Sequence, residues 1–298
     1  MVDDDAMRWP LMRPPNRLVL IGIGSSFYAA GVAALRLRVA GINAVAENSA
    51  AESIGPIGED DTVIGISAGG ESIETIRLFG ASAGGRSIAL TNQAASSIAR
   101  LAGATMEMHA GAERGGIACR TYVHTLIALL ALEQQLTSAS FDLAGVLRRA
   151  ADAIDSLLAR SDQWLATAVE LLAGPNGTWL LAPLERVSSA LQGALMLREG
   201  PRRPGVGCET GDWSHVHVYL TATLDYRALV VPGSRWDEQA AEWMTERRST
   251  IVSVGAPFPG ARLVVDYPGS DDPLVALLTE TTVAELVAAS LWLGDAGR

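Results

Sequence analysis

Short apolar runs alternate with helix-length amphipathic stretches along the chain, and this alternation constrains the fold more than any other feature of the sequence. The runs have the length of strands, whereas the stretches between them repeat apolar residues with the period of an α-helix. Strands joined by helices lie parallel in one sheet, with helices on both faces, so the sequence predicts an α/β fold. The predicted strands are residues 18–23, 43–46, 62–66, 86–91 and 104–108 in the first half, and 177–182, 227–232, 249–254 and 262–266 in the second half.

The two halves also look like repeats of one another. Residues 18–38 read as a strand, a turn and a helix ending in Ala-Leu-Arg-Leu-Arg, and residues 178–198 follow the same order, ending in Ala-Leu-Met-Leu-Arg. Self-similarity at this spacing indicates two similar folded units. We therefore expect two doubly wound, flavodoxin-like lobes, each with a mainly parallel sheet of about five strands. The expected division is an N-terminal extension over 1–16, a first lobe over 17–140, linking helices over 141–176 and a second lobe over 177–298.

Turns rich in glycine and serine follow two predicted strands of the first lobe, at residues 22–26 and 67–72. Glycine lets the backbone approach a ligand, serine donates hydrogen bonds, and the free amides of a following helix attract an anion. The same residue types also form ordinary strand-to-helix loops. Together the two turns predict a phosphorylated ligand held by Gly24, Ser25, Ser26, Ser67, Gly69, Gly70 and Ser72.

The second lobe lacks turns of this composition. Its corresponding segments are residues 182–185, Ala-Pro-Leu-Glu, and residues 232–235, Pro-Gly-Ser-Arg, which offer fewer suitable donors. We therefore expect one ligand site per chain, in the first lobe.

Charge and composition exclude several classes of protein. The formal net charge is −10 and basic residues cluster only at Arg198, Arg202 and Arg203, so we expect no nucleic-acid partner. No apolar run approaches the roughly 20 residues that span a bilayer, and the acidic start has no signal-peptide core, so we expect a cytoplasmic protein without a membrane partner. Cys119 and Cys208 have neither disulfide-framework nor metal-ligand spacing, and we expect no metal and no cofactor.

All 23 residues counted as Lys or Arg are arginine, so the chain contains no lysine. A lysine amine is the usual group that forms a Schiff base with a sugar carbonyl, and a guanidinium cannot replace it because it stays protonated. Any chemistry on a sugar must therefore proceed without a Schiff base to this chain.

Four segments carry motifs in a fixed order. Residues 22–28 look like a Gly-Thr-Ser turn, residues 67–75 like a Ser-x-Ser-Gly-Glu-Thr phosphate loop, and residues 110–115 like an Ala-Gly-x-Glu-x-Gly segment. Residues 190–199 match an Ala-Leu-x-Gly-Ala-Leu-x-Leu-x-Glu helix. These motifs resemble the sugar isomerase (SIS) domain family, and most closely the two-lobed isomerase half of glucosamine-6-phosphate synthase. The resemblance implies two SIS-type lobes, a sugar-phosphate ligand and a homodimer.

The resemblance also implies catalytic roles for two residues. Glu199 matches the family's proton-transferring glutamate, and His215, sixteen residues later, matches the histidine that opens the sugar ring. A carboxylate suits the proton transfer between C1 and C2, and an imidazole titrates near neutrality, as ring opening requires. Apart from the resemblance, Glu199 reads as a solvated helix end and His215 as a loop histidine.

The chain departs from the family pattern in ways that leave its function open. Ala68 and Gly69 stand where the phosphate loop has Gln and Ser, Met196 stands where the synthase has a lysine, and Val216 follows His215 in place of Gly-Pro. We expect no counterpart of the synthase's glutamine-hydrolysing domain. Three functions remain: an aldose–ketose isomerase acting on a sugar 6-phosphate, a deglycase or deaminase acting on an amino-sugar or fructosamine phosphate, and a non-catalytic sugar-phosphate sensor. A Glu and His pair without lysine most resembles the deglycase branch, and the sequence does not choose the sugar.

Four further residues have alternative interpretations. His124 lies on an apolar stretch and is expected to be a core histidine, whereas His109 ends a strand and is left unassigned. Glu113 either serves the ligand or caps a loop, and Arg120 either reaches an anion or forms a surface ion pair.

Overall fold

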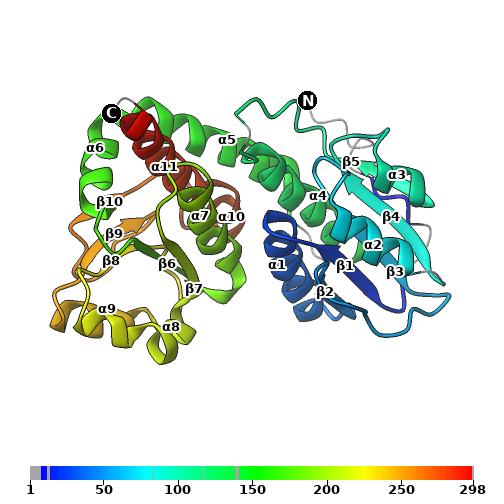
Figure 1. Cartoon of the computed structure of the whole chain (residues 1–298), viewed down its shortest axis with the longest axis horizontal. Helices are drawn as coiled ribbons and strands as arrows, with labels where there is room; N and C mark the ends of the chain where they lie inside the picture. Colours follow the sequence, from blue (N-terminus) through cyan, green and yellow to red (C-terminus); the bar gives the residue numbers. More distant parts are fainter. Residues whose placement is uncertain (1–7, 12–13, 83, 116, 138–140, 297–298) are drawn as a thin grey trace. The chain divides into compact units, whose positions relative to one another are not determined.

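A computed structural model of the chain describes residues 8–11, 14–82, 84–115, 117–137 and 141–296. The chain divides into two compact units, unit 1 over Met1–Leu143 and unit 2 over Ala144–Arg298. Figure 1 shows a sheet flanked by helices in each unit. The expected α/β fold with two parallel sheets is confirmed. The helices expected to link the lobes, over 141–176, group with unit 2.

Unit 1 contains five parallel strands in the order β2-β1-β3-β4-β5. Every residue of β1 and β3 is buried, because helices cover both faces of the sheet. All five strands predicted for this half are present. The strands are β1 (Leu18–Gly22), β2 (Ala44–Asn48), β3 (Thr62–Ile66), β4 (Arg86–Thr91) and β5 (Ala104–Glu107), and the helices are α1 (Ser25–Val39), α2 (Ile73–Ala81), α3 (Ser97–Leu101) and α4 (Arg120–Leu136).

The two faces of this sheet carry different helices. Val19, Ile21 and Val63 pack with Leu78 of α2 and Ile98 of α3 in one buried cluster. The side chains between them point to the other face, where α1 covers β1 and α4 packs on α1. A charged pair joins these two helices, since the Arg36 guanidinium donates to both carboxylate oxygens of Glu133 at 2.7 and 2.9 Å. The Glu133 side chain is only 8% exposed.

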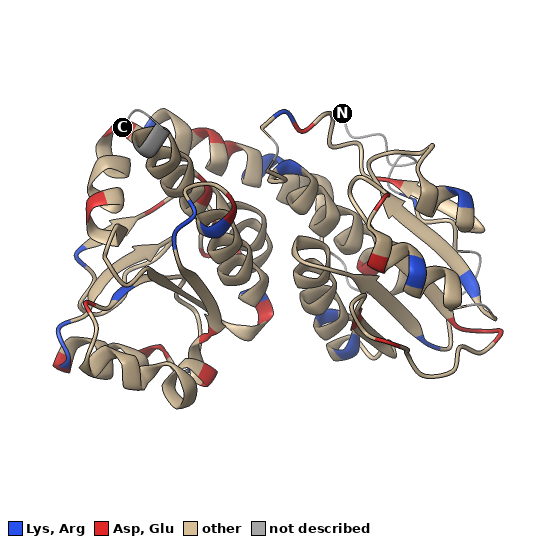
Figure 2. Cartoon of the chain, viewed as in Figure 1, with Lys and Arg blue, Asp and Glu red and all other residues tan. Residues whose placement is uncertain are grey.

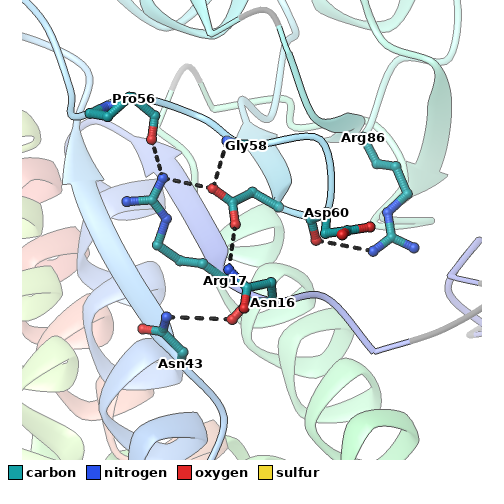
Figure 3. A network of polar contacts seen from close by, with 8 residues as sticks. Asn16, Arg17, Asn43, Pro56, Gly58, Asp60 and Arg86 are labelled. Atoms are coloured by element: carbon teal, nitrogen blue, oxygen red, sulfur yellow. Dashed lines mark hydrogen bonds and ion pairs between the residues drawn. The ribbon is translucent and has the colours of Figure 1, made fainter.

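A polar network closes the amino edge of the same sheet (Figure 3). The Asp61 carboxylate, just before β3, accepts from the Gly58 amide at 2.9 Å, the Arg17 guanidinium at 2.8 Å and the Asn16 side chain at 3.3 Å. Burial raises the pKa of Asp61, but these hydrogen bonds outweigh it and the net pKa is lowered. The network holds the starts of β1 and β3 together. None of its residues lies at the carboxyl ends of these two strands.

Unit 2 repeats this topology with strand order β10-β9-β8-β6-β7, again all parallel. The order matches that of unit 1 when β6 to β10 are taken as the counterparts of β1 to β5. The strands are β6 (Thr178–Ala182), β7 (Gly205–Glu209), β8 (Arg227–Val230), β9 (Thr250–Val254) and β10 (Leu263–Val265). The helices are α5 (Leu143–Ala159), α6 (Ser161–Leu172), α7 (Val187–Glu199), α8 (Thr210–Val216), α9 (Asp237–Glu246), α10 (Pro273–Thr279) and α11 (Thr281–Ala296), with short 3₁₀ turns η1 (Leu184–Arg186) and η2 (Val218–Ala222).

The sequence did not predict β7. Its segment, Gly-Val-Gly-Cys-Glu, follows Pro204 and contains two glycines, so no apolar run marks it as a strand. The strand forms because β6 pairs with it over its whole length. Gly207 also allows α7 to approach closely, since a Cβ there would lie 2.5 Å from the carbonyl oxygen of Ala190.

We expected no apolar run of the roughly 20 residues that span a bilayer, and one helical segment departs from this expectation. The helical segment Pro273–Gly294 is long and apolar enough to cross a membrane by length and composition. However, 72% of its most apolar window is buried inside the structure, and α11 packs against α6 and α7. The segment also contains Glu280, which is 2% exposed and forms an ion pair with Arg186 at 3.2 Å. We interpret α10 and α11 as core helices of unit 2.

Candidate functional site

The candidate site lies at the carboxyl edge of the sheet of unit 1. There β1 and β3 are neighbours, while the connections from them lead in opposite directions, to β2 and to β4. Ligands of open α/β sheets bind outside the carboxyl ends of strands at such a point. The loop over 23–26 follows β1 and the loop over 67–72 follows β3. The fold therefore brings the two predicted phosphate turns to adjacent strand ends.

Three serine hydroxyls at this edge make no hydrogen bond to any residue that the structure describes. Ser25 and Ser26, which begin α1, are half-buried, and Ser67 is 6% exposed. The first amides of a helix have no partner within the helix, so the start of α1 adds donors beside these hydroxyls. The arrangement offers neutral donors without a charged side chain, which suits an anion that brings its own charge.

The loop after β3 is shaped by Gly70. Gly70 has a φ of +70°, and its amide donates to the Ser67 carbonyl at 3.0 Å, which closes a tight turn. A Cβ on Gly70 would lie 2.0 Å from the Ser96 hydroxyl, so only glycine fits. Gly69, by contrast, is exposed, and a Cβ there would meet nothing within 4 Å. Gly70 therefore holds the loop in shape, while Gly69 leaves its backbone open to a ligand.

Two loop residues have structural partners of their own. Ser72, a predicted phosphate ligand, is the N-cap of α2: its hydroxyl accepts from the Thr75 amide at 3.4 Å and lies 3.1 Å from the Glu74 carboxylate. The Glu71 carboxylate accepts from the Ser97 hydroxyl at 2.6 Å and the Ser97 amide at 2.8 Å, and these bonds lower the pKa of Glu71. Ser72 thus sets the start of α2, and Glu71 joins the loop to α3.

Glu199, the predicted proton-transferring group, is the last residue of α7 in unit 2. Partial desolvation raises the pKa of its carboxyl group, and the neighbouring charges of Arg198 and Arg202 oppose this shift. A raised pKa makes a carboxylate a stronger base, which is the property that proton abstraction from carbon needs.

His215, the predicted ring-opening group, lies exposed in the last turn of α8. This helix begins at the carboxyl end of β7, whereas α7 runs back from β6 and ends beside the amino end of β7. Glu199 therefore lies at the amino end of the strands of unit 2, whereas His215 lies on a helix that begins at their carboxyl end.

Other candidate residues have clear structural partners. Glu113 accepts from the Thr121 amide at 2.8 Å, so its carboxylate joins the segment before α4 to the first turn of that helix. Arg120 lies 3.7 Å from the Glu113 carboxylate, in the expected ion pair. The His124 ring bonds the Met108 carbonyl at 2.8 Å on the partly buried helix α4, while His109 lies exposed, 3.8 Å from Glu107, just after β5.

Sequence reasoning missed Asn92, which follows the last residue of β4. Its side chain accepts from the Ala110 amide at 2.8 Å and donates to the Gly111 carbonyl at 2.7 Å. It therefore ties the segment after β5 to the carboxyl edge where the candidate site lies. The only sequence signal was an asparagine directly after a predicted strand, which is common in ordinary turns.

Comparisons with known proteins agree with this fold. The family model described as the SIS domain matches residues 11–133. Glutamine–fructose-6-phosphate aminotransferase (isomerizing) of Aquifex aeolicus is 26% identical over 283 residues, which cover 89% of this chain and 47% of that protein. The chain thus spans about half the length of this relative, and the similarity confirms the resemblance to an isomerase half.

Two solved structures have the same fold. The C-terminal domain of glucosamine-fructose-6-phosphate aminotransferase from Francisella tularensis superposes with a TM-score of 0.78 at 16% identity, covering 94% of this chain and 84% of that one. Glucosamine-6-phosphate deaminase from Thermotoga maritima has a TM-score of 0.72 at 15% identity, covering 94% and 86%. The two-unit architecture is therefore shared along nearly the whole chain.

Proposed function

From the match of residues 11–133 to the SIS domain we propose that unit 1 binds a sugar 6-phosphate on which the protein then acts. The observation that carries the proposal is the set of unbonded hydroxyls of Ser25, Ser26 and Ser67 at adjacent strand ends, beside the open backbone of Gly69. The phosphate would accept hydrogen bonds from these hydroxyls and from the loop amides, with Gly24, Gly70 and Ser72 shaping the two loops.

The proposed reaction is aldose–ketose isomerisation, or removal of an amine from an amino-sugar or fructosamine phosphate. In the isomerase form, the Glu199 carboxylate takes a proton from one of the carbons C1 and C2 of the open-chain sugar and returns it to the other. His215 would donate a proton to the ring oxygen as the ring bond breaks and receive one from the anomeric hydroxyl. The raised pKa of Glu199 supports its role as the base.

We further propose that the protein works as a homodimer in the cytoplasm, without nucleic acid or membrane. In such a dimer Glu199 and His215 of one chain can serve different sites. This agrees with Glu199 lying at the amino end of the strands and His215 lying on a helix that begins at their carboxyl end. Light scattering across a range of protein concentrations tests this, and a monomer throughout would count against it.

The catalytic step is tested by following glucose, mannose, fructose, glucosamine and fructosamine 6-phosphates by NMR. Isomerised product or released amine should appear for at least one sugar, and both Glu199→Gln and His215→Ala should abolish the turnover. Glu238→Gln, on the exposed face of α9, is a matched control that should keep it. Turnover that survives in both catalytic variants would end the assignment of this pair.

A non-catalytic sensor is the second candidate, because the chain lacks the lysine of the synthase pattern, although a deglycase with a Glu and His pair would not need it. The synthase pattern places a lysine one helical turn before the glutamate, at the position of Met196 here. Tight binding of a sugar phosphate without turnover of any sugar in the panel would support the sensor.

A further inference from the structure

Unit 2 contains a pocket of about 460 Å³ at the carboxyl ends of β6, β7 and β8. This volume lies within the range of small-molecule sites. Figure 1 shows α8 and α9 together on one side of this sheet, and both helices begin after loops at these strand ends. The pocket is lined by Leu184, Glu185, Glu209, Gly233, Ser234, Arg235 and Trp236.

The pocket occupies the same topological position as the candidate phosphate site of unit 1. Its strands β6 and β8 are neighbours from which the connections lead in opposite directions, as with β1 and β3. The segment over 231–236 follows β8 as the phosphate loop follows β3. A ligand position at this edge is therefore expected from the fold.

The loop after β8 is already bonded to an anion of its own. The Asp237 carboxylate accepts from the Gly233 amide at 2.6 Å and from the Ser234 amide at 3.2 Å. These are the kind of loop amides that would otherwise hold a phosphate. A phosphate in this pocket could not accept from these amides and would be repelled by the Asp237 carboxylate. The pocket therefore disfavours a phosphorylated ligand.

The lining is acidic with an aromatic wall. The lining contains two carboxylates, Glu185 and Glu209, and Arg235 as its sole cation. Figure 2 shows further acidic residues on α8 and α9. One oxygen of Glu209 accepts from the Asp212 amide at 2.8 Å, which leaves the other for a ligand. Two carboxylates attract an ammonium group and accept from hydroxyls.

The aromatic wall is Trp236, whose side chain is held in place by a close neighbour. A Cβ on Gly211 would lie 2.6 Å from its ring, so the ring packs directly against the α8 backbone. Trp236 remains 47% exposed, which leaves ring surface for a ligand. An indole face suits both the C–H face of a sugar and a nearby cation.

Arg186 supports the loop from beneath. Its guanidinium donates to the Pro232 carbonyl at 2.6 Å and forms the ion pair with the buried Glu280 at 3.2 Å. The loop is therefore fixed by hydrogen bonds to two side chains, those of Asp237 and Arg186.

We propose that this pocket of unit 2 is a second ligand site, which takes an unphosphorylated amino sugar, with Glu185 and Glu209 binding the ammonium and hydroxyl groups and Trp236 stacking on the ring. The site is independent of the phosphate site proposed for unit 1. It replaces the single site per chain that the sequence suggested.

The test uses the full chain with fluorotryptophan in place of its seven tryptophans, and the Trp236 signal is assigned from Trp236→Phe. Glucosamine is titrated and followed by fluorine NMR, beside N-acetylglucosamine, glucosamine 6-phosphate and inorganic phosphate. We expect a saturable shift of the Trp236 signal with glucosamine, weaker binding of N-acetylglucosamine because its amine is uncharged, and no shift with phosphate.

The variant Glu185→Gln/Glu209→Gln should weaken glucosamine binding about tenfold or more, since each charge-assisted bond becomes a neutral one. Glutamine at position 209 retains an acceptor for the Asp212 amide, so α8 stays capped, and circular dichroism checks the fold. Glu238→Gln is the matched control and should bind as the wild type does.

Either of two results would overturn the proposal: a Trp236 signal that does not saturate with glucosamine, or one that responds at least as strongly to the phosphates. Unchanged affinity in the double variant would do the same. The Trp236 response should persist in Ser25→Ala/Ser67→Ala, so loss of the site in unit 1 and loss of the site in unit 2 are measured separately.

Discussion

The loops after β3 and β8 occupy equivalent places in two sheets of the same strand order, yet they present opposite chemistry to a ligand. Among the described residues nothing accepts from the Gly69 amide or pairs with the Ser67 hydroxyl. In the loop after β8, the Gly233 and Ser234 amides already donate to Asp237. The comparison teaches that two loops at equivalent places in one topology can differ in their free donors, because one side chain, Asp237, occupies the amides of the second loop.

Each unit also contains a buried arginine–glutamate pair of different quality. In unit 1, Arg36 binds both oxygens of Glu133. In unit 2, Arg186 reaches Glu280 through a single contact of 3.2 Å, and the Glu280 side chain is fully buried. Burial raises the pKa of Glu280 to about 7 despite the nearby guanidinium. A bidentate pair and a single contact should therefore respond differently to removal of the carboxylate charge.

The largest expected effect is on ligand binding in unit 1. The variant Ser25→Ala/Ser67→Ala should weaken binding of glucosamine 6-phosphate or fructose 6-phosphate about a hundredfold or more, because two hydrogen bonds to a charged group are lost. Both hydroxyls are unbonded, so folding should be unaffected. Calorimetry measures the change, and Ser87→Ala, at the amino end of β4, is the control. Unchanged affinity in the double variant would show that the two loops are structural only.

The next largest effect is the loss of stability when the ion pair of unit 1 is removed. Glu133→Ala leaves the Arg36 guanidinium without its carboxylate against the α1–α4 packing, which should cost about 3 kcal/mol of unfolding free energy. Urea denaturation followed by circular dichroism measures this cost. Glu52→Ala, at an exposed position in the same unit, should change stability little. A loss of unfolding free energy in Glu133→Ala below that of the control would show that the bidentate contact does not stabilise unit 1.

The pair of unit 2 should show itself in the pH dependence of stability. The folded pKa of Glu280 lies near 7, above its ordinary value of 4.5, so the native state binds more protons between these values. The contribution of Glu280 to the free energy of unfolding is then fully present below about pH 4.5. It is lost as the pH rises through 7, by up to about 3 kcal/mol. Glu280→Gln should remove this dependence, as urea denaturation at the two ends of the window would show. A slope that persists in the variant would assign it to other groups.

The smallest expected effect is a gain of phosphate affinity when the loop after β8 is changed to resemble the loop after β3. Asp237→Ala frees the Gly233 and Ser234 amides, and unit 2 should then gain affinity for inorganic phosphate by roughly tenfold over the wild type. Asp237→Asn keeps an oxygen acceptor for the same amides and should gain little. Phosphate titration followed by the Trp236 fluorine signal compares the two variants. If the alanine variant gains nothing, the loops after β3 and β8 are not equivalent in the way proposed.

Much of the fold could be predicted from local pattern, and the exceptions share a cause. The strands of unit 1 were predictable from short, mainly apolar runs separated by helix-length stretches, and two of these strands, β1 and β3, are buried along their whole length. The strand β7 was not, since Gly205 and Gly207 carry no apolar side chain and the segment becomes a strand only through pairing with β6. In the site, Ser67 was predictable from glycine and serine next to a strand, but the capping role of Ser72 depends on where α2 begins.

By itself, the sequence determined the α/β class, the duplication into two units and the position of two phosphate-type turns, because apolar periodicity and turn composition act over a few residues. Only the tertiary structure decided which donors stay free. Asp237 takes the amides of its own loop, and Arg186 reaches Glu280, 94 residues later in the chain. Such pairings depend on distances that the folding of distant segments sets. The same topology therefore carries unbonded serine hydroxyls in unit 1 and an acidic pocket in unit 2.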